Sequence, residues 1–443
     1  MSLHPLQQRL RAVDPVRRTG RVRRIMATHI EADGPDAGLG ALCEVETQSS
    51  GGARKCLAEV VRVNRESIIL SPFEDGFATF SGAIVRASDE ADSVPVGSAF
   101  LGRAVDALGR PADGKGDILA DAVFPLRGAA PAPLERTSPA ETLETGIRAI
   151  DGLITLGKGQ RVGVFAASGV GKTTLVTQLA RHVGADVTIL CLVGERGREV
   201  EAIWHGGLSA ESRSKATLVA ATSDQSASMR VRASHYALAL AEYWRDQGKH
   251  VLLLLDSVTR LAMAMREIGL AAGEPPTVRA YTPSVFAQIP KLVERCGALK
   301  SGGAISAIIT VLSETDDIDD PVSELMKSLL DGHIILSRPL AEEGHFPPID
   351  VCRSVSRQSQ SLMGSQHHRQ AMQVLEWMSL HQSSRTLVDT GLYAKGANRR
   401  IDLAIEKYPE IVRFLKQDSA QRVAIQATSH ALSQLAGEVE HAI

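Results

Sequence analysis

The residues best suited to chemistry lie in one short loop, where small side chains lead into Gly-Lys-Thr-Thr. The loop follows an apolar stretch, 161–165, and precedes a segment, 175–183, with apolar residues at helical spacing. A strand, a small-residue loop and a helix in this order are the context of a phosphate-binding loop. Its first position has alanine where the general pattern has glycine. The residues predicted to hold a nucleotide are Ala166, Ala167, Ser168, Gly169, Val170, Gly171, Lys172, Thr173 and Thr174.

The chemistry of this loop predicts ATP and Mg²⁺ as its ligands. Backbone N–H groups of residues 169–173 can surround a phosphate, because small residues let the main chain approach and the helix start adds partial positive charge. Lys172 would bring an ammonium group to the β- and γ-phosphates, and the Thr173 hydroxyl would bind Mg²⁺. The alternative is a turn that packs and binds nothing, which the flanks and the Lys-Thr pair disfavour.

Two carboxylates at the ends of later apolar runs are candidates for hydrolysis. Glu195 and Arg196 follow the run 187–193, and Asp256 ends the run 250–255. In parallel sheets, functional groups gather at the carboxyl ends of strands. Glu195 could polarise the attacking water, Asp256 could orient hydrated Mg²⁺, and Arg196 and Arg260 could line the phosphate site. The alternatives are a solvated Glu195 in a charged loop and a capped turn at Asp256.

The elements that must position these residues follow from the pattern of apolar residues. Strands are expected at 161–166, 187–193, 216–221, 250–255, 304–312 and 333–336, separated by helix-length segments, which indicates a mainly parallel sheet covered on both faces. Short alternating stretches between residues 20 and 95 indicate a small β-barrel or sandwich. Glycine and proline cluster at 105–139 as a connector, and helices are expected at 370–387 and 401–415.

We therefore divide the chain into a helical arm (1–19), a β-barrel domain (20–95), a nucleotide-binding domain (96–358) and a helical domain (359–443). The arm has apolar residues at helical spacing between positions 3 and 13, with arginines on its other face. A cationic face of this kind can dock on a partner or on an anionic lipid surface. The alternative is a solvated arm.

Composition limits the class of protein. The 443 residues include 49 Lys and Arg against 51 Asp and Glu, and 4% are aromatic. This balance disfavours a nucleic-acid binder, which needs a basic surface and stacking residues. No apolar run approaches the ~20 residues of a membrane-spanning helix, and no apolar core follows the early arginines, so we expect a cytoplasmic protein. The five cysteines and the adjacent His367 and His368 lack metal-ligand spacing.

Longer motifs resemble the ATPase family of type III protein export, which is akin to the catalytic subunit of rotary ATP synthases. The similar segments are 194–200 (Gly-Glu-Arg-Gly-Arg-Glu-Val), 256–276, 283–287 (Pro-Ser-Val-Phe-Ala) and 330–338 (Leu-Asp-Gly-His-Ile-Ile-Leu-Ser-Arg). The resemblance covers nearly the whole chain. It implies an α/β fold, with a RecA-like P-loop NTPase domain, an N-terminal β-barrel and a C-terminal helical domain, assembled as a homohexamer. Residues 392–396 (Leu-Tyr-Ala-Lys-Gly) are more similar to the flagellar branch than to the injectisome branch.

The resemblance also implies roles for charged residues. In that family the acid of the Gly-Glu-Arg motif activates water, which corresponds to Glu195, and the residues corresponding to Arg196 and Arg260 face phosphate. An arginine from the neighbouring subunit corresponds to Arg357 in Ser-Val-Ser-Arg, and a guanidinium there would neutralise charge on the γ-phosphoryl oxygens. Arg338 and Arg353 are nearby alternatives, and a plain surface arginine is another.

Three further positions bear on the shape of the site. Phe346 matches an aromatic residue that flanks adenine in relatives, with a core aromatic as the alternative. Ala167 replaces a glycine that is common in flagellar relatives. Residues 280–284 read Ala-Tyr-Thr-Pro-Ser where Gly-Tyr-Pro-Pro-Ser is usual. The loss of a glycine and a proline changes the allowed backbone angles, so the conformation of this loop stays open.

The function implied is a Mg-dependent ATPase that converts ATP to ADP and phosphate and drives export of flagellar proteins across the inner membrane. The implied partners are a regulator or stator, a central stalk, export substrates and their chaperones, without nucleic acid. The implied location is cytoplasmic, peripheral at the cytoplasmic face of the inner-membrane export gate. The alternatives are an injectisome ATPase of the same type, a rotary ATP synthase subunit and a nucleotide-bound scaffold without turnover.

Overall fold

A computed structural model of the chain describes residues 19–49, 52–74, 76, 78–88, 93–312 and 320–437. The amphipathic helix expected between residues 3 and 13 lies outside this range. The chain forms two compact units. The first contains the chain up to Ser93 together with 224–232 and 263–285, and the second contains the remainder. Within the described residues, no helix has the length and apolar character needed to span a membrane.

The first unit is built on a closed six-stranded barrel, which confirms the barrel in the expected fold class. Apolar residues alternate along its strands, so one face of each strand fills the interior, as with Val45, Val60 and Val85. Gly20 is required where two strand-end segments meet, because a Cβ there would lie 2.1 Å from the backbone of Gly34. In barrel order the strands are β1 (Thr19–Ile25), β2 (Ile30–Ala32), β5 (Ile68–Pro72), β4 (Gly52–Val63), β3 (Leu42–Ser49) and β6 (Ile84–Ala87).

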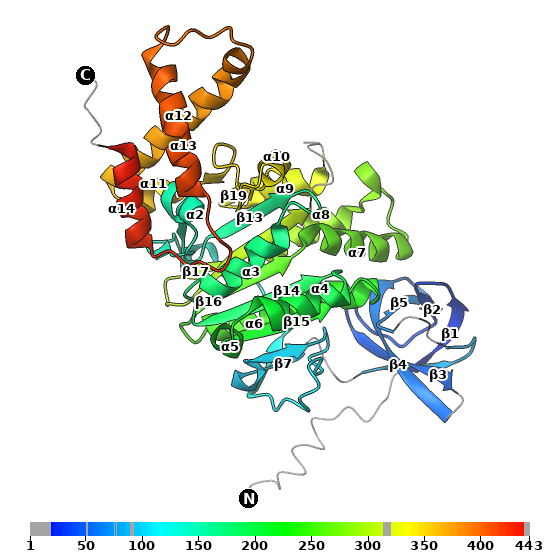
Figure 1. Cartoon of the computed structure of the whole chain (residues 1–443). Coiled ribbons are helices and arrows are strands. Elements are labelled where there is room, and N and C mark those ends of the chain that lie inside the picture. The colour runs from blue at the N-terminus through cyan, green and yellow to red at the C-terminus, as the bar shows by residue number, and fades with distance from the viewer. Residues whose placement is uncertain are drawn as a thin grey trace, which may run out of the picture. The chain divides into compact units, whose positions relative to one another are not determined.

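The second unit has a large sheet whose central strands are parallel, as expected (Figure 1). All six strands expected from apolar runs are present, with bounds within about one residue of those expected. The path of the sheet is β20 (Val355–Ser356), β19 (Gly332–Ile335), β13 (Arg161–Ala166), β18 (Ala304–Leu312), β16 (His250–Asp256), β14 (Val187–Val193), β15 (Ala216–Ala221) and β8 (Arg103–Val105). β17 (Gly297–Leu299) and β10 (Arg136–Thr137) extend it from β18. Two small sheets pair β7 (Ser93–Val96) with β9 (Ala122–Pro125) and β11 (Thr142–Leu143) with β12 (Leu156–Gly157).

Helices connect the parallel strands and form the C-terminal part of the chain. The helices among the strands are α2 (Arg148–Leu153), α3 (Lys172–His182), α4 (Gly197–Glu201), α5 (Ala210–Ser214), α6 (Ala227–Arg245), α7 (Val258–Ala271), α8 (Pro283–Val293), α9 (Pro321–Leu329) and α10 (Arg338–Glu342). After them come α11 (Ser359–Leu362), α12 (Ser365–Asp389), α13 (Arg399–Leu415) and α14 (Ile425–Ala436), which confirm the expected helical C-terminal region. The long pair α12 and α13 forms the orange hairpin in Figure 1.

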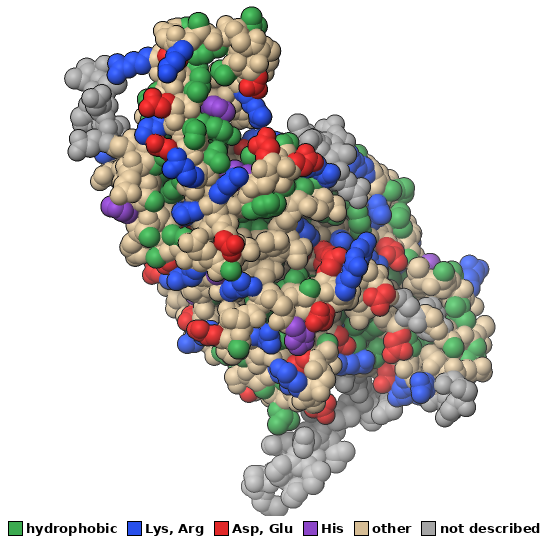
Figure 2. Space-filling view, in the orientation of Figure 1, with side chains coloured by type: hydrophobic (Ala, Val, Ile, Leu, Met, Phe, Trp, Pro, Cys, Tyr) green, Lys and Arg blue, Asp and Glu red, His purple; other side chains and the backbone are tan. Residues whose placement is uncertain are grey.

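The surface carries charges of both signs. Figure 2 shows Lys and Arg side chains interspersed with Asp and Glu on the visible face. This distribution agrees with the formal net charge of −2. Mixed surface charge of this kind supports solvation without creating a single large field.

The edge strand β8 lies beside the segment interpreted from sequence as a connector. It pairs in parallel with β15, and the buried Thr217 hydroxyl donates to the Phe100 carbonyl at 2.8 Å. Arg103 donates through Nε and Nη2 to both oxygens of Asp113, at 2.8 and 3.0 Å. The Asp113 side chain is only 2% exposed. A bidentate charged pair therefore fixes this short strand at the sheet edge.

Asp113 predicts a pH dependence of stability. Hydrogen bonding from Arg103, with further N–H groups from Lys115 and Ala104, holds the pKa of Asp113 well below its ordinary value. Its stabilising effect is therefore present above about pH 4 and declines as the pH falls below that value, because the unfolded chain then binds the proton more readily. We expect Asp113→Asn to lower the free energy of unfolding by about 2 kcal/mol at pH 7 and by less at pH 3, measured by urea unfolding.

The matched control is Glu211→Gln, which removes an exposed carboxylate paired with Lys215. Exposed pairs contribute little, so this variant should unfold like the wild type at both pH values. A difference between wild type and Asp113→Asn that stays constant from pH 7 to pH 3 would contradict the proposed role of the Asp113 charge.

Candidate active site

The predicted phosphate loop forms the link between the end of β13 and the start of α3. Gly169 and Gly171 have φ values of 80° and 107°, a region that favours glycine, and Gly171 is the residue that precedes the helix. Val170 is buried in the core, whereas Ser168 and Gly169 are exposed. Leu175 and Leu179 anchor the helix to the sheet. The loop therefore presents its exposed backbone at the N-terminus of an eleven-residue helix, where anions bind favourably.

Four charged residues predicted to act together form one continuous cluster beside this loop. The Lys172 ammonium group binds Asp256 Oδ1 and lies 3.2 Å from Glu195 Oε1. Arg260 Nη2 lies 3.3 Å from Glu195 Oε2, and Arg260 Nη1 donates to the Gly194 carbonyl. These residues come from the start of α3, the ends of β14 and β16, and the first turn of α7. The parallel sheet brings all four to the carboxyl ends of its strands, as predicted.

The two carboxylates of this cluster are buried, so their charges require partners. The Asp256 side chain is 1% exposed and the Glu195 side chain 4% exposed. A buried carboxylate is strongly unfavourable without a cation or hydrogen-bond donors. Each acid here has a cationic partner, and Lys172 serves both. The predicted alternative of a solvated Glu195 is therefore not what the structure contains.

One residue of this cluster escaped the sequence reasoning. The hydroxyl of Thr310 on β18 donates to Asp256 Oδ1 at 2.7 Å, and Thr310 is 1% exposed. The available signal was a hydroxyl within the otherwise apolar run 307–312. Buried polar side chains in such a run need a partner, but periodicity alone does not say which one.

Other predicted residues lie outside the cluster. Arg196 is exposed at the start of α4, and Thr173 and Thr174 are exposed in the first turn of α3. Phe346 is 52% exposed, so its ring is not a core aromatic. Arg338 lies against the phosphate loop of its own chain, with Nη2 3.4 Å from the Ser168 carbonyl.

Arg357 lies at the opposite end of the sheet from the phosphate loop of its own chain. Its backbone N–H donates to the Asp331 carbonyl, and the Asp331 N–H donates to the Arg161 carbonyl at the amino end of β13. The loop follows the carboxyl end of β13, five residues further, or about 17 Å at the usual rise per strand residue. Arg357 is exposed, with Nη2 3.4 Å from the Lys327 carbonyl. It therefore does not approach its own phosphate loop.

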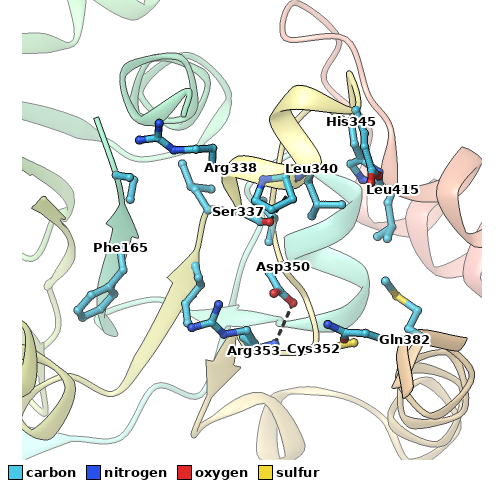
Figure 3. A pocket seen from close by; sticks show the side chains of 18 of the residues that line it. Phe165, Ser337, Arg338, Leu340, His345, Asp350, Cys352, Arg353, Gln382 and Leu415 are labelled. Atoms are coloured by element: carbon cyan, nitrogen blue, oxygen red, sulfur yellow. Dashed lines mark hydrogen bonds between the residues drawn. The ribbon is translucent and has the colours of Figure 1, made fainter. Parts of the chain in front are cut away.

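A cavity of about 680 Å³ adjoins the phosphate loop on the side of the C-terminal helices (Figure 3). Phe165 and Ala166 line it from the end of β13, and Ala167 lines it from the start of the phosphate loop. On the helical side, His381 of α12 stacks on Tyr408 of α13 with ring centroids 3.6 Å apart. The remaining polar lining includes Arg338, Glu343, Asp350, Arg353, Gln382 and Arg385, whereas Phe346 is absent from the lining. Sequence analysis missed this cavity because its walls come from segments far apart in the chain.

The sequence of this chain matches two protein families and is similar to several known proteins. The ATP synthase alpha/beta family, nucleotide-binding domain, matches residues 146–356, and the T3SS EscN ATPase C-terminal domain matches residues 363–434. The flagellum-specific ATP synthase of Bacillus subtilis is 42% identical over 96% of this chain and 97% of its own length. The SPI-2 type 3 secretion system ATPase of Salmonella typhimurium is 43% identical over 93% of this chain and 94% of its own length.

Solved structures agree with these sequence matches. The assembled ATPase EscN from the type III secretion system of enteropathogenic E. coli superposes with a TM-score of 0.89 at 38% identity, covering 94% of this chain and 100% of that chain. EscN in complex with its central stalk EscO gives a TM-score of 0.86 at 37% identity, with the same coverage. The similarity therefore extends over nearly the whole chain.

The charge cluster predicts a stability effect that needs no ligand. Lys172→Met would leave the buried Glu195 and Asp256 without their shared cation, and removal of one partner from a buried ion pair costs about 3 kcal/mol or more. We expect this loss in the free energy of unfolding, measured by denaturant titration without nucleotide. Lys158→Met, which removes the partner of the exposed Glu141, should have little effect. Equal stability of the two variants would show that Lys172 does not compensate the buried acids.

Proposed function

The chain belongs to the family of flagellar and type III secretion ATPases, and we propose that it hydrolyses ATP to drive export of flagellar proteins across the inner membrane. The observation that carries this proposal is the buried Glu195 carboxylate, held beside the Lys172 ammonium group at the mouth of a phosphate-binding loop. A loop that only bound nucleotide would not need a second carboxylate beside Lys172 in addition to Asp256. The Glu195 carboxylate can act as the general base that hydrolysis requires.

We assign the binding of phosphates to the loop and Lys172. Backbone N–H groups of residues 169–173 would surround the β-phosphate, and Lys172 would turn from the two carboxylates to the β- and γ-phosphates. Glu195 would accept a proton from the attacking water, with its carboxylate oriented by Arg260 at 3.3 Å. Arg196, the exposed residue that directly follows Glu195, would face the γ-phosphate. The exposed ring of Phe346 would flank adenine.

The residues at this site fit Mg²⁺. Mg²⁺ prefers oxygen ligands, retains waters and is usually held by one or two protein groups together with substrate phosphates. The Thr173 hydroxyl and the Asp256 carboxylate supply such oxygens, and the described residues contain no cluster of three or more acidic, histidine or cysteine side chains that would hold a metal alone. When bound, Mg²⁺ would neutralise phosphate charge. Thr173 would bind it directly and Asp256 through water.

Completion of the site would require a second copy of the chain. Arg357 lies at the amino end of the sheet and is exposed, so it is available to a neighbouring molecule and not to its own loop. EscN, which superposes over nearly the whole chain, was solved as an assembled ATPase. We propose a homohexamer in which Arg357 enters the site of the adjacent subunit and neutralises charge on the γ-phosphoryl oxygens.

The partners proposed are those of an export apparatus. They are a central stalk, by similarity to EscN in complex with EscO, a regulator or stator, and export substrates with their chaperones. The location proposed is the cytoplasmic face of the inner-membrane export gate, with peripheral association. An injectisome ATPase is the second candidate function, because relatives from the flagellar and the type 3 secretion systems have nearly the same sequence identity to this chain, 42% and 43%. Loss of motility in a deletion strain would favour flagellar export, and loss of effector delivery the injectisome.

The first test of this function is phosphate release by the purified protein with Mg-ATP. Lys172→Ala should lose nucleotide binding and turnover, and Glu195→Gln should retain binding but lose turnover by roughly 10²-fold or more, because it lacks the base. Glu199→Gln changes a nearby carboxylate of α4 outside the cluster and should keep wild-type turnover. Wild-type rates in both Lys172→Ala and Glu195→Gln would refute the assignment. Absence of turnover in the wild type, with nucleotide bound, would instead favour the scaffold.

A second test addresses the shared site. Arg357→Ala should leave ATP affinity nearly unchanged while lowering turnover by roughly 10³-fold, as for other arginine fingers. Mixing Arg357→Ala with Lys172→Ala should restore part of the activity, because one copy supplies an intact loop and the other an intact Arg357. Arg399→Ala, which truncates an exposed arginine at the start of α13, is the matched control and should stay active. Failure of the mixture to exceed either variant, although mixed assemblies form, would exclude a site shared between subunits.

A further inference from the structure

Thr310 lies at the centre of the sheet, between the strand that leads to the phosphate loop and the strand that ends in Asp256. Its strand β18 pairs with β13 on one side and with β16 on the other. The hydroxyl donates to Asp256 Oδ1 at 2.7 Å, and the Leu255 carbonyl lies 3.4 Å away. Thr310 and Asp256 are each 1% exposed. This is a buried hydrogen bond to a carboxylate, a strong class of hydrogen bond in proteins.

Two donors from different elements converge on the same oxygen of Asp256. Lys172 Nζ and Thr310 Oγ1 both bind Oδ1, one from the first residue of α3 and the other from a central strand. The two donors differ in the conformational freedom of their side chains. Lys172 has a long flexible side chain, whereas threonine is β-branched and restricted at χ1. Thr310 is therefore the fixed donor and Lys172 the mobile one.

The backbone of β18 just after Thr310 is also fixed by hydrogen bonds. The Leu312 N–H donates to Thr259 Oγ1 at 2.9 Å, and the Thr259 hydroxyl lies 3.3 Å from the Leu312 carbonyl. Thr259 belongs to α7, the helix that follows Asp256. These contacts tie the carboxyl end of β18 to the segment that carries Asp256, so Thr310 and Asp256 keep their relative positions.

We propose that Thr310 is a positioning residue that holds the Asp256 carboxylate in place when Lys172 leaves it for the phosphates of the nucleotide. This inference rests on the proposed function, because only a bound nucleotide draws Lys172 away. Without Thr310, the buried carboxylate would lose its fixed donor at the moment when its cation moves. Asp256 would then either retain Lys172 or turn out of position, and each outcome weakens the Mg²⁺-dependent part of nucleotide binding.

The test compares affinity for Mg-ADP with affinity for ADP in excess EDTA, measured by isothermal titration calorimetry on the full chain. Thr310→Val preserves shape and removes the hydroxyl, and we expect it to weaken Mg-ADP binding by roughly tenfold while metal-free ADP binding changes little. Thr310→Ser keeps the donor and should restore most of the Mg-ADP affinity. Thr310→Ala removes the same hydroxyl without placing a methyl group against Asp256, and it should repeat the loss if Thr310→Val does not fold.

Thr217→Val is the matched control. Thr217 is also a buried strand threonine, and its hydroxyl donates to the Phe100 carbonyl at 2.8 Å and not to a carboxylate. It should lose thermal stability without any change in the ratio of the two affinities. Equal weakening of Mg-ADP and metal-free ADP in the Thr310 variants, or no weakening of either, would overturn the positioning role. A wild-type chain that binds neither form of ADP would overturn the proposed function itself.

Discussion

The site is organised by two carboxylates that the fold removes from water. Asp256 is the last residue of β16 and Glu195 lies two residues beyond β14. Both strands are mainly apolar and buried, so the same burial that stabilises them places two negative charges at one edge of the sheet. Burial of both would be strongly unfavourable without Lys172 and Arg260 between and beside them. The end of the phosphate loop, which carries Lys172, and the start of α7, which carries Arg260, must therefore lie beside the strand ends that carry the two acids. If one of these elements lay elsewhere, a carboxylate would be buried without its cationic partner.

This constraint also explains how the site can be stable and still bind a highly charged ligand. Lys172 neutralises both carboxylates by direct contact, and a triphosphate would bring negative charges that compete for the same ammonium group. Binding then exchanges one set of ionic partners for another and does not create an unpaired charge. Such an exchange requires that the carboxylates keep other donors, and Arg260 on Glu195 and Thr310 on Asp256 meet that requirement. The fixed donors are as necessary to the site as the mobile lysine.

Much of this arrangement could be predicted from the sequence, because the information is local. The mainly apolar runs that lead to Ala166, Val193 and Asp256 are long enough to predict the strand bounds and the residues at the carboxyl ends. Long-range pairing is not encoded locally, and this is where prediction stopped. The three-residue strand β8 depends on Asp113 ten residues later, and the contact of Thr310 with Asp256 depends on which strands are neighbours. The cavity walled by α12 and α13 joins segments more than 200 residues apart and had no sequence signal.

The loop at residues 277–281 shows how a local departure from the family pattern is accommodated. Ala280, which replaces the usual glycine, has a φ of 59°, and Arg279 before it has a φ of 53°. The left-handed region is unfavourable by roughly 1 kcal/mol or more for a residue with a Cβ atom. Thr277 offsets this strain by closing the loop on itself, since its N–H and its hydroxyl both donate to the Tyr281 carbonyl. Ala280 thus adopts the left-handed conformation that favours glycine, and the hydrogen bonds at the base of the loop offset the cost of its Cβ atom.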